Sequence, residues 1–190
     1  MFGITERDTK VLLDLAESAI RARLEGRPEP AVDLASLSPE LRRPIGAFVT
    51  LHVGGALNGC IGNITASEPL APEVARLALA AAFADPRLPA LGSDELDRLD
   101  IDISLLSEPT GIPARSRHEL LAHLRPGDDG LIIRSGRHQA LFLPSVWRQL
   151  PQPDDFVDQL FRKARLRPEP WPTDLTASGF TTATVHRSLR

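Results

Sequence analysis

The chain has 190 residues, 42% of them hydrophobic, and a formal net charge of -3 at pH 7. This length and composition allow one domain with a real core, with or without a smaller lobe. The charge gives no electrostatic reason to expect binding to nucleic acid or to an anionic membrane. The single cysteine excludes an internal disulfide and a metal site built from several thiolates.

The first ten residues lack the basic segment and apolar run that mark an export signal. No apolar stretch approaches the roughly 20 residues that are needed to cross a bilayer. We therefore expect a soluble, cytoplasmic protein.

Hydrophobic periodicity, capping residues and turn residues predict the secondary structure. In chain order we expect a helix that begins after Thr5 and ends by Gly26, strands at 46–53 and 56–61, a helix at 70–83, a strand at 100–106, a helix at 116–124, strands at 131–134 and 138–142, helices at 145–150 and 154–166, and a strand at 180–186. Strands joined by hairpins, with helices between them, predict an α+β fold: a largely antiparallel sheet flanked by helices. No linker is long enough to separate independent domains.

The most informative segment is the end of the strand at 56–61, where Cys60 stands between Gly59 and Gly62. Glycines let backbone or a ligand come close to a site. The segment is therefore a candidate for binding or thiol chemistry. The alternative is structural, because a buried cysteine is a common small hydrophobic residue of protein cores.

The glycine pair at 54–55 predicts a two-residue hairpin turn, and that turn sets the strand register. Cys60 then lies opposite Val49, and Asn58 lies opposite Leu51. The alternation of side chains along a strand follows from this pairing.

On that alternation Cys60 and Asn58 share one face of the sheet, while His52 and Thr50 lie on the other. A Cys60–His52 dyad is therefore disfavoured unless a β-bulge shifts the alternation. With no histidine on its face, Cys60 is expected to react slowly with thiol reagents. The other histidines are dispersed and lack ligand spacing, so neither a metal site nor a cofactor is expected.

Seven blocks of the sequence, in order, resemble the signature of the AMMECR family. They are GAFVTL (46–51), LNGCIG (57–62), AAFADPRLP (81–89), ISLLSEP (103–109), GLII (130–133), FLP (142–144) and FRKA (161–164). The resemblance covers nearly the whole chain. One departure concerns the site, since the family usually has arginine where Asn58 stands.

The resemblance implies one α+β domain over residues 1–190, in which a larger lobe contains both termini. A smaller lobe is expected within about 108–145. Prokaryotic members resemble component A of the AmmeMemoRadiSam system, which is encoded with a Memo-like protein and a radical S-adenosylmethionine enzyme. The family has no settled biochemical activity.

Two functions therefore remain. In the first, the protein is a partner-dependent accessory protein with a ligand cleft around Cys60 and Arg87, lined also by Asn58, Gly59, Gly62 and Asp85. In the second, it is an enzyme that uses Cys60 as nucleophile or redox thiol on a small anionic or carbonyl-bearing substrate. Arg87 would then hold the substrate, and Asp85 would orient Arg87.

Overall fold

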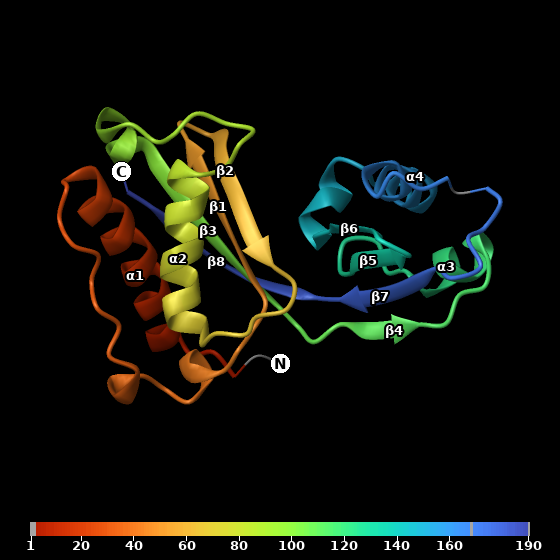
Figure 1. The fold of residues 1–190 in the computed structure, drawn as a ribbon, viewed down its shortest axis with the longest axis horizontal. Helices are drawn as coiled ribbons and strands as arrows, with labels where there is room; N and C mark the ends of the chain where they lie inside the picture. The colour runs from red at the N-terminus through yellow and green to blue at the C-terminus, as the bar shows by residue number, and fades with distance from the viewer. Residues whose placement is uncertain (1–2, 168, 190) are drawn as a thin grey trace. The chain divides into compact units, whose positions relative to one another are not determined.

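The computed structural model describes residues 3–167 and 169–189, which fold into two compact units (Figure 1). Unit 1 comprises the residues up to Leu106 and those from Ala183 onward, whereas unit 2 comprises Ser107–Thr182. Unit 1 thus contains the described residues nearest to both ends of the chain, as expected of the larger lobe. Unit 2 takes in the lobe expected within about 108–145 and continues to Thr182.

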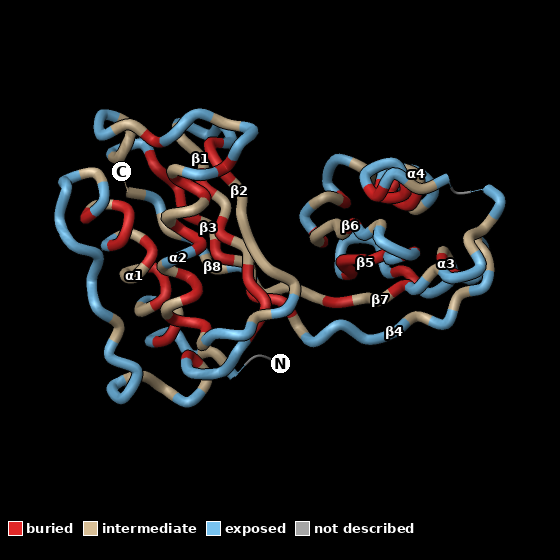
Figure 2. Tube along the Cα trace, in the orientation of Figure 1, coloured by how far each residue is buried: buried red, intermediate tan, exposed pale blue. Residues whose placement is uncertain are grey.

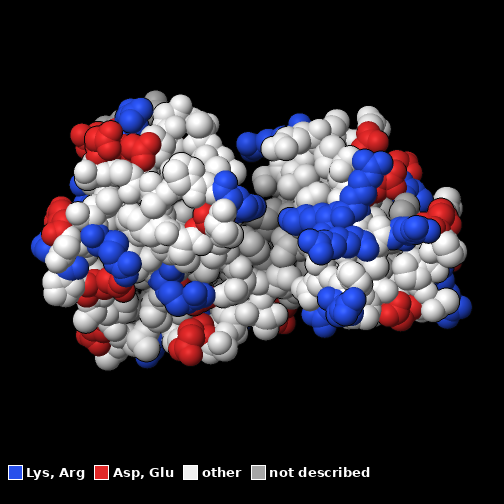
Figure 3. Space-filling view, turned by 45° about the horizontal axis from the view of Figure 1, so that its top comes forward, with Lys and Arg blue, Asp and Glu red and all other residues white. Residues whose placement is uncertain are grey.

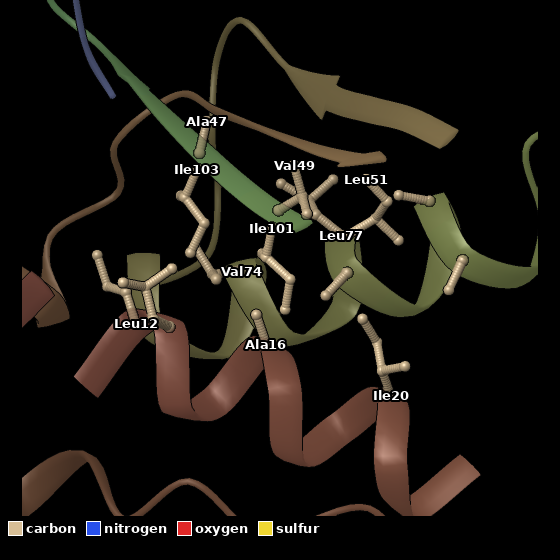
Figure 4. Packing of buried hydrophobic residues seen from close by; sticks show 14 of the residues in the cluster. Leu12, Ala16, Ile20, Ala47, Val49, Leu51, Val74, Leu77, Ile101 and Ile103 are labelled. Carbon is tan, nitrogen blue, oxygen red and sulfur yellow. The ribbon is translucent and has the colours of Figure 1, made fainter. Parts of the chain in front are cut away.

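Unit 1 is built from two helices and a four-stranded sheet in the order β2-β1-β3-β8. The helices are α1 (Glu6–Leu24) and α2 (Leu70–Phe83), and the strands are β1 (Ala47–Val53), β2 (Ala56–Asn63), β3 (Leu99–Leu106) and β8 (Thr182–Ser188). Short 3-10 helices span Leu34–Ser36, Glu40–Arg42 and Ser93–Arg98. Both α-helices pack on the same face of this sheet, where their apolar side chains meet those of β1 and β3 (Figure 4).

Strand β1 shows how the sheet separates its two faces. Val49 and Leu51 are fully buried beneath the helices, whereas Thr50 and His52 are partly exposed on the opposite face. On the neighbouring strand β3, Asp102 and Ser104 lie opposite Thr50 and Phe48 and are therefore on this second face as well. We call it the polar face of unit 1.

The two helices of unit 1 follow the sequence prediction closely. Thr5 caps α1, since its hydroxyl accepts a hydrogen bond from the Asp8 N–H and the Asp8 carboxylate accepts one from the Thr5 N–H. The bounds of α2 are those predicted, with Pro69 before its first turn. Local capping and hydrophobic periodicity were therefore sufficient to predict both helices.

Unit 2 has its own sheet, in the order β4-β7-β5-β6. Its elements are β4 (Thr110–Ile112), α3 (Arg117–His123), β5 (Gly130–Ser135), β6 (His138–Phe142), a 3-10 helix (Pro144–Arg148), α4 (Pro153–Lys163) and β7 (Thr176–Phe180). Trp147 stacks on Phe156 with 3.8 Å between the ring centroids. The buried residues of α4 and β5 stand out in Figure 2, and they give unit 2 a hydrophobic core separate from that of unit 1.

The predicted α+β class is confirmed, with two antiparallel sheets in place of one. The prediction of a single strand at 180–186 was wrong, because β7 ends at Phe180 and β8 begins at Thr182. Between them the backbone of Thr181 bonds to Ser107, with Ser107 N donating to Thr181 O at 2.9 Å. Thr181 N donates to the Ser107 hydroxyl at 3.0 Å. The helix predicted at 145–150 is the 3-10 helix Pro144–Arg148.

None of the helices in the described part of the chain is long and apolar enough to cross a membrane. Acidic and basic side chains are interleaved on the face of unit 1 that Figure 3 shows, whereas basic side chains gather on part of unit 2. Although the net charge of the chain is small, its charged side chains are therefore unevenly distributed over the surface.

Candidate functional site

The hairpin of β1 and β2 contains a β-bulge. Its two-residue turn at Gly54–Gly55 has positive φ at both positions, and His52 lies opposite Leu57. The register then shifts between Leu51 and His52, so that Leu51 faces Gly59 and Asn58 is the additional residue. The predicted pairs of Asn58 with Leu51 and of Cys60 with Val49 were therefore wrong.

Two glycines explain why the strand takes this path. A Cβ at Gly59 would overlap the carbonyl oxygen of Ala81 in α2, and a Cβ at Gly62 would overlap the Phe48 ring. Each glycine lets another part of unit 1 approach the strand, which is the structural use of glycine in a strand. Because of the bulge, Gly59 lies on the face of the sheet that the helices cover, where it packs closely under α2.

The bulge also decides which residues surround the thiol. Cys60 lies opposite Thr50, whose hydroxyl donates a hydrogen bond to the Cys60 sulfur at 3.2 Å. His52 is two residues from Thr50 on β1 and so shares the polar face with it. The prediction that His52 lies on the face opposite Cys60 was wrong, because the additional residue shifts the alternation.

Asp102 continues this arrangement onto β3, where it lies opposite Thr50. One carboxylate oxygen is 3.5 Å from Nδ1 of His52, and the other is 2.9 Å from Nδ1 of His186 on β8. The polar face therefore carries a thiol, a hydroxyl, two imidazoles and a carboxylate across its four strands. Sequence reasoning missed Asp102 and the pairing with His186, although the alternation of Asp100 and Asp102 in their strand was a signal.

At the edge of the sheet, Asp85 and Arg87 hold the backbone of Cys60. Cys60 N donates to Asp85 Oδ2 at 3.0 Å, and Arg87 Nη2 donates to Cys60 O at 2.9 Å. Arg87 also donates to Asp85 from Nε at 2.8 Å and from Nη2 at 2.6 Å. Because β2 is an outer strand, these side chains satisfy backbone groups that no further strand pairs with.

The electrostatics of this pair follow from burial and hydrogen bonding. The Asp85 side chain is 1% exposed, and the Arg87 side chain is 62% exposed. Hydrogen bonds from Arg87 and from the Cys60 and Arg87 N–H groups hold the pKa of Asp85 far below its usual range, although burial acts in the opposite direction. The hydrogen bonds to Asp85 and the negative charge of that carboxylate raise the pKa of Arg87.

The structure thus brings together four of the residues that the sequence singled out, namely Gly59, Cys60, Asp85 and Arg87. Asn58 is buried at the bulge, and its Oδ1 has no hydrogen-bond partner within the described residues. Gly62 packs on Phe48. Within residues 3–167 and 169–189, no group of three acidic, histidine or cysteine residues is arranged to hold a metal ion.

Comparison with known proteins identifies relatives of this chain. A protein from Methanosarcina mazei is 34% identical over 174 residues, which are 88% of this chain and 85% of the relative. A protein from Saccharolobus islandicus is 34% identical over 169 residues, which are 85% of this chain and 73% of the relative.

A solved structure is also similar, that of the uncharacterised protein PH0010 from Pyrococcus horikoshii. Its TM-score is 0.87 at 30% sequence identity, and the match covers 97% of this chain and 93% of that one. The model of the AMMECR1 family matches residues 13–185. Because this match spans both units, the chain belongs to the AMMECR1 family.

Proposed function

We propose that the protein acts in the cytoplasm as component A of an AmmeMemoRadiSam-like system. In this role it is an accessory protein that works with a Memo-like protein and a radical S-adenosylmethionine enzyme, and it binds a ligand at a cleft around Cys60 and Arg87. Family membership supports the choice of system. The ligand site rests on one observation, which is that the buried Asp85 holds an exposed Arg87 against the backbone of Cys60.

The ligand that suits this site is a small anion. Arg87 uses Nε and Nη2 for Asp85 and Cys60, and its Nη1 forms no hydrogen bond with any described residue. A guanidinium fixed in this way presents N–H donors in a geometry that matches carboxylate and phosphate oxygens. Asn58 cannot supply a positive charge, so Arg87 is the group that would bind an anion here.

Reconstitution tests this proposal. We expect the protein to co-elute with the Memo-like protein and the radical enzyme of its own organism, and cleavage of S-adenosylmethionine by the complex to require it. Arg87→Met should lower that cleavage about tenfold while co-elution persists. Arg76→Met is a matched control, because Arg76 is 58% exposed and holds the buried Glu73 through Nε and Nη2 in the same way.

Two outcomes would reject parts of the proposal. Failure of the three proteins to co-elute would exclude partner dependence. Equal loss of activity in Arg87→Met and Arg76→Met would exclude the ligand cleft, because both changes would then act through the stability of unit 1 alone.

A second candidate is favoured by the bulge, namely an enzyme that uses Cys60 as nucleophile or redox thiol. His52 lies diagonally across from Cys60 on the polar face, a distance of about 7–8 Å between Cα atoms that an imidazole can bridge. A carboxylate oxygen of Asp102 lies 3.5 Å from Nδ1 of that imidazole. The order thiol, imidazole, carboxylate is that of nucleophilic catalysis, with His52 as base and Asp102 as the residue that orients it.

Labelling with iodoacetamide at pH 7 tests this second function. If His52 activates the thiol, the wild type labels rapidly and stoichiometrically, and His52→Ala slows labelling about tenfold. His118→Ala, which removes an exposed imidazole in unit 2, should leave the rate unchanged. Slow labelling of the wild type, unchanged by His52→Ala, would reject the enzyme and leave the accessory role.

A further inference from the structure

Unit 2 contains a groove that takes no part in the site at Cys60. It has a volume of about 260 Å³ and runs beside the outer strand β4. Ile112, Pro113 and Phe180 supply apolar surface, whereas His123, Arg125 and Asp129 supply polar groups. Ligand sites have this composition, a mostly apolar concavity with a few placed polar groups.

The cationic group of the groove is exposed to solvent, whereas its anionic partner is buried. Asp129 is buried, and its carboxylate accepts hydrogen bonds from Arg125 N at 2.8 Å, from Nε at 3.2 Å and from Nη2 at 2.6 Å. The Arg125 side chain is 66% exposed. The carboxylate of Asp129 is therefore buried and hydrogen-bonded within the protein, whereas the guanidinium of Arg125 remains exposed at the surface of the groove.

Arg125 is also held in place before any ligand arrives. Trp147 Nε1 donates to the carbonyl oxygen of Asp129 at 2.7 Å, and Trp147 itself is stacked on Phe156 in the core. Asp129 is thereby anchored, and it fixes Arg125 along one edge of the guanidinium. Fixing a flexible side chain in advance removes part of the entropic cost of binding.

Donors remain available at the groove. No described residue forms a hydrogen bond with Nη1 of Arg125. His123 donates from Nδ1 to the carbonyl oxygen of Glu119 at 2.8 Å, so its Nε2 becomes a second donor in the imidazolium form. A guanidinium and an imidazolium at one apolar concavity suit an oxyanion attached to an apolar body.

We propose that this groove binds a small organic anion, a carboxylate or phosphate joined to a compact apolar group. Arg125 and His123 bind the oxyanion, and Ile112, Pro113 and Phe180 contact the apolar part. The volume limits the ligand to on the order of ten non-hydrogen atoms, fewer than most drug-sized ligands have. The site is independent of the function proposed at Cys60, since it lies wholly within unit 2.

Titration of the full-length, ¹⁵N-labelled protein, followed by amide NMR, tests the site with four probes. Phenyl phosphate and benzoate distinguish the two anion sources, inorganic phosphate tests the charge alone, and benzyl alcohol tests the apolar group alone. We expect saturable shifts at Gly111 and Phe180 with phenyl phosphate, benzoate or both, and at least about fivefold weaker binding of the other two probes. Shifts that do not saturate, or that centre on Arg87, would overturn the proposal.

Substitutions test which side chains of the groove contribute to the free energy of ligand binding. Arg125→Met combined with Asp129→Asn removes the charge without leaving a buried carboxylate unpaired, and should weaken binding about tenfold. Arg134→Met is the control, since Arg134 is an exposed arginine on β5 that does not line the groove, and its loss should leave the affinity unchanged. An unchanged affinity in the double variant would reject the site. If that variant does not fold, His123→Ala decides at pH 5.5, with at least threefold weaker binding expected and unchanged binding contradicting the proposal.

Discussion

Each unit holds an exposed arginine on a buried aspartate, but the two pairs do different work. Asp85 and Arg87 reach back to Cys60, 25 and 27 residues earlier in the chain, and tie an outer strand to the segment after α2. Asp129 and Arg125 are four residues apart and close the turn that leads into β5. The same chemical pair thus locks tertiary structure in unit 1 and stabilises a local turn in unit 2.

The largest expected difference between the pairs is in stability. Asp85→Ala leaves the Cys60 N–H without its acceptor and removes three hydrogen bonds from Arg87, so we expect a loss of about 2–4 kcal/mol in the free energy of unfolding. Asp129→Ala should cost about 1–2 kcal/mol, because its contacts lie within one turn. Urea denaturation of both variants measures these losses in the free energy of unfolding. Equal losses would show that the contact of Asp85 with Cys60 adds no stability beyond that of a local pair.

A second comparison uses glycine. Gly59→Ala places a methyl group into the Ala81 carbonyl and should destabilise the protein by about 1–3 kcal/mol, because backbone on both sides must move. Gly111 on β4 has no atom within 4 Å of an added Cβ, so Gly111→Ala should change stability by less than about 0.5 kcal/mol. Thermal unfolding of both variants checks the contrast. A tolerated Gly59→Ala would mean that α2 can move away from β2.

The pH dependence should also identify Asp85. Its folded-state pKa lies below the unfolded value of about 3.9, so the ionised carboxylate stabilises unit 1 above about pH 4. That stabilisation is lost as the pH falls through the folded pKa. The stability difference between the wild type and Asp85→Asn should therefore be full at pH 7 and shrink below pH 4, as measured by urea unfolding at each pH. A difference that is constant with pH would contradict this assignment.

The smallest effect is expected on the polar face. Asp102 is 27% exposed and His186 is 57% exposed, and pairs of this kind contribute less than about 1 kcal/mol. A double-mutant cycle of Asp102→Asn and His186→Ala should give a coupling energy within that limit at pH 6. A larger coupling energy would show that the Asp102–His186 pair, like the Asp85–Arg87 pair, contributes substantially to the stability of unit 1.

Much of this protein was determined by local sequence. The cap at Thr5, the bounds of α2 and the turn at Gly54–Gly55 were predicted correctly, because each depends on residues within a few positions of one another. The resemblance to a family brought Cys60 and Arg87 together, although no local pattern connects them.

Tertiary structure decided the rest. The approach of α2 to Gly59 accompanies a bulge at Asn58, and that one additional residue turns Cys60 toward the face of Thr50 and His52. The break at Thr181 likewise depends on Ser107, far away in sequence, and it assigns two adjoining strands to different sheets. A single inserted residue reverses which side chains of a strand face each side of the sheet. A strand register predicted from a turn therefore holds only as far as the first bulge. The position of a bulge depends in turn on the residues that pack against the strand.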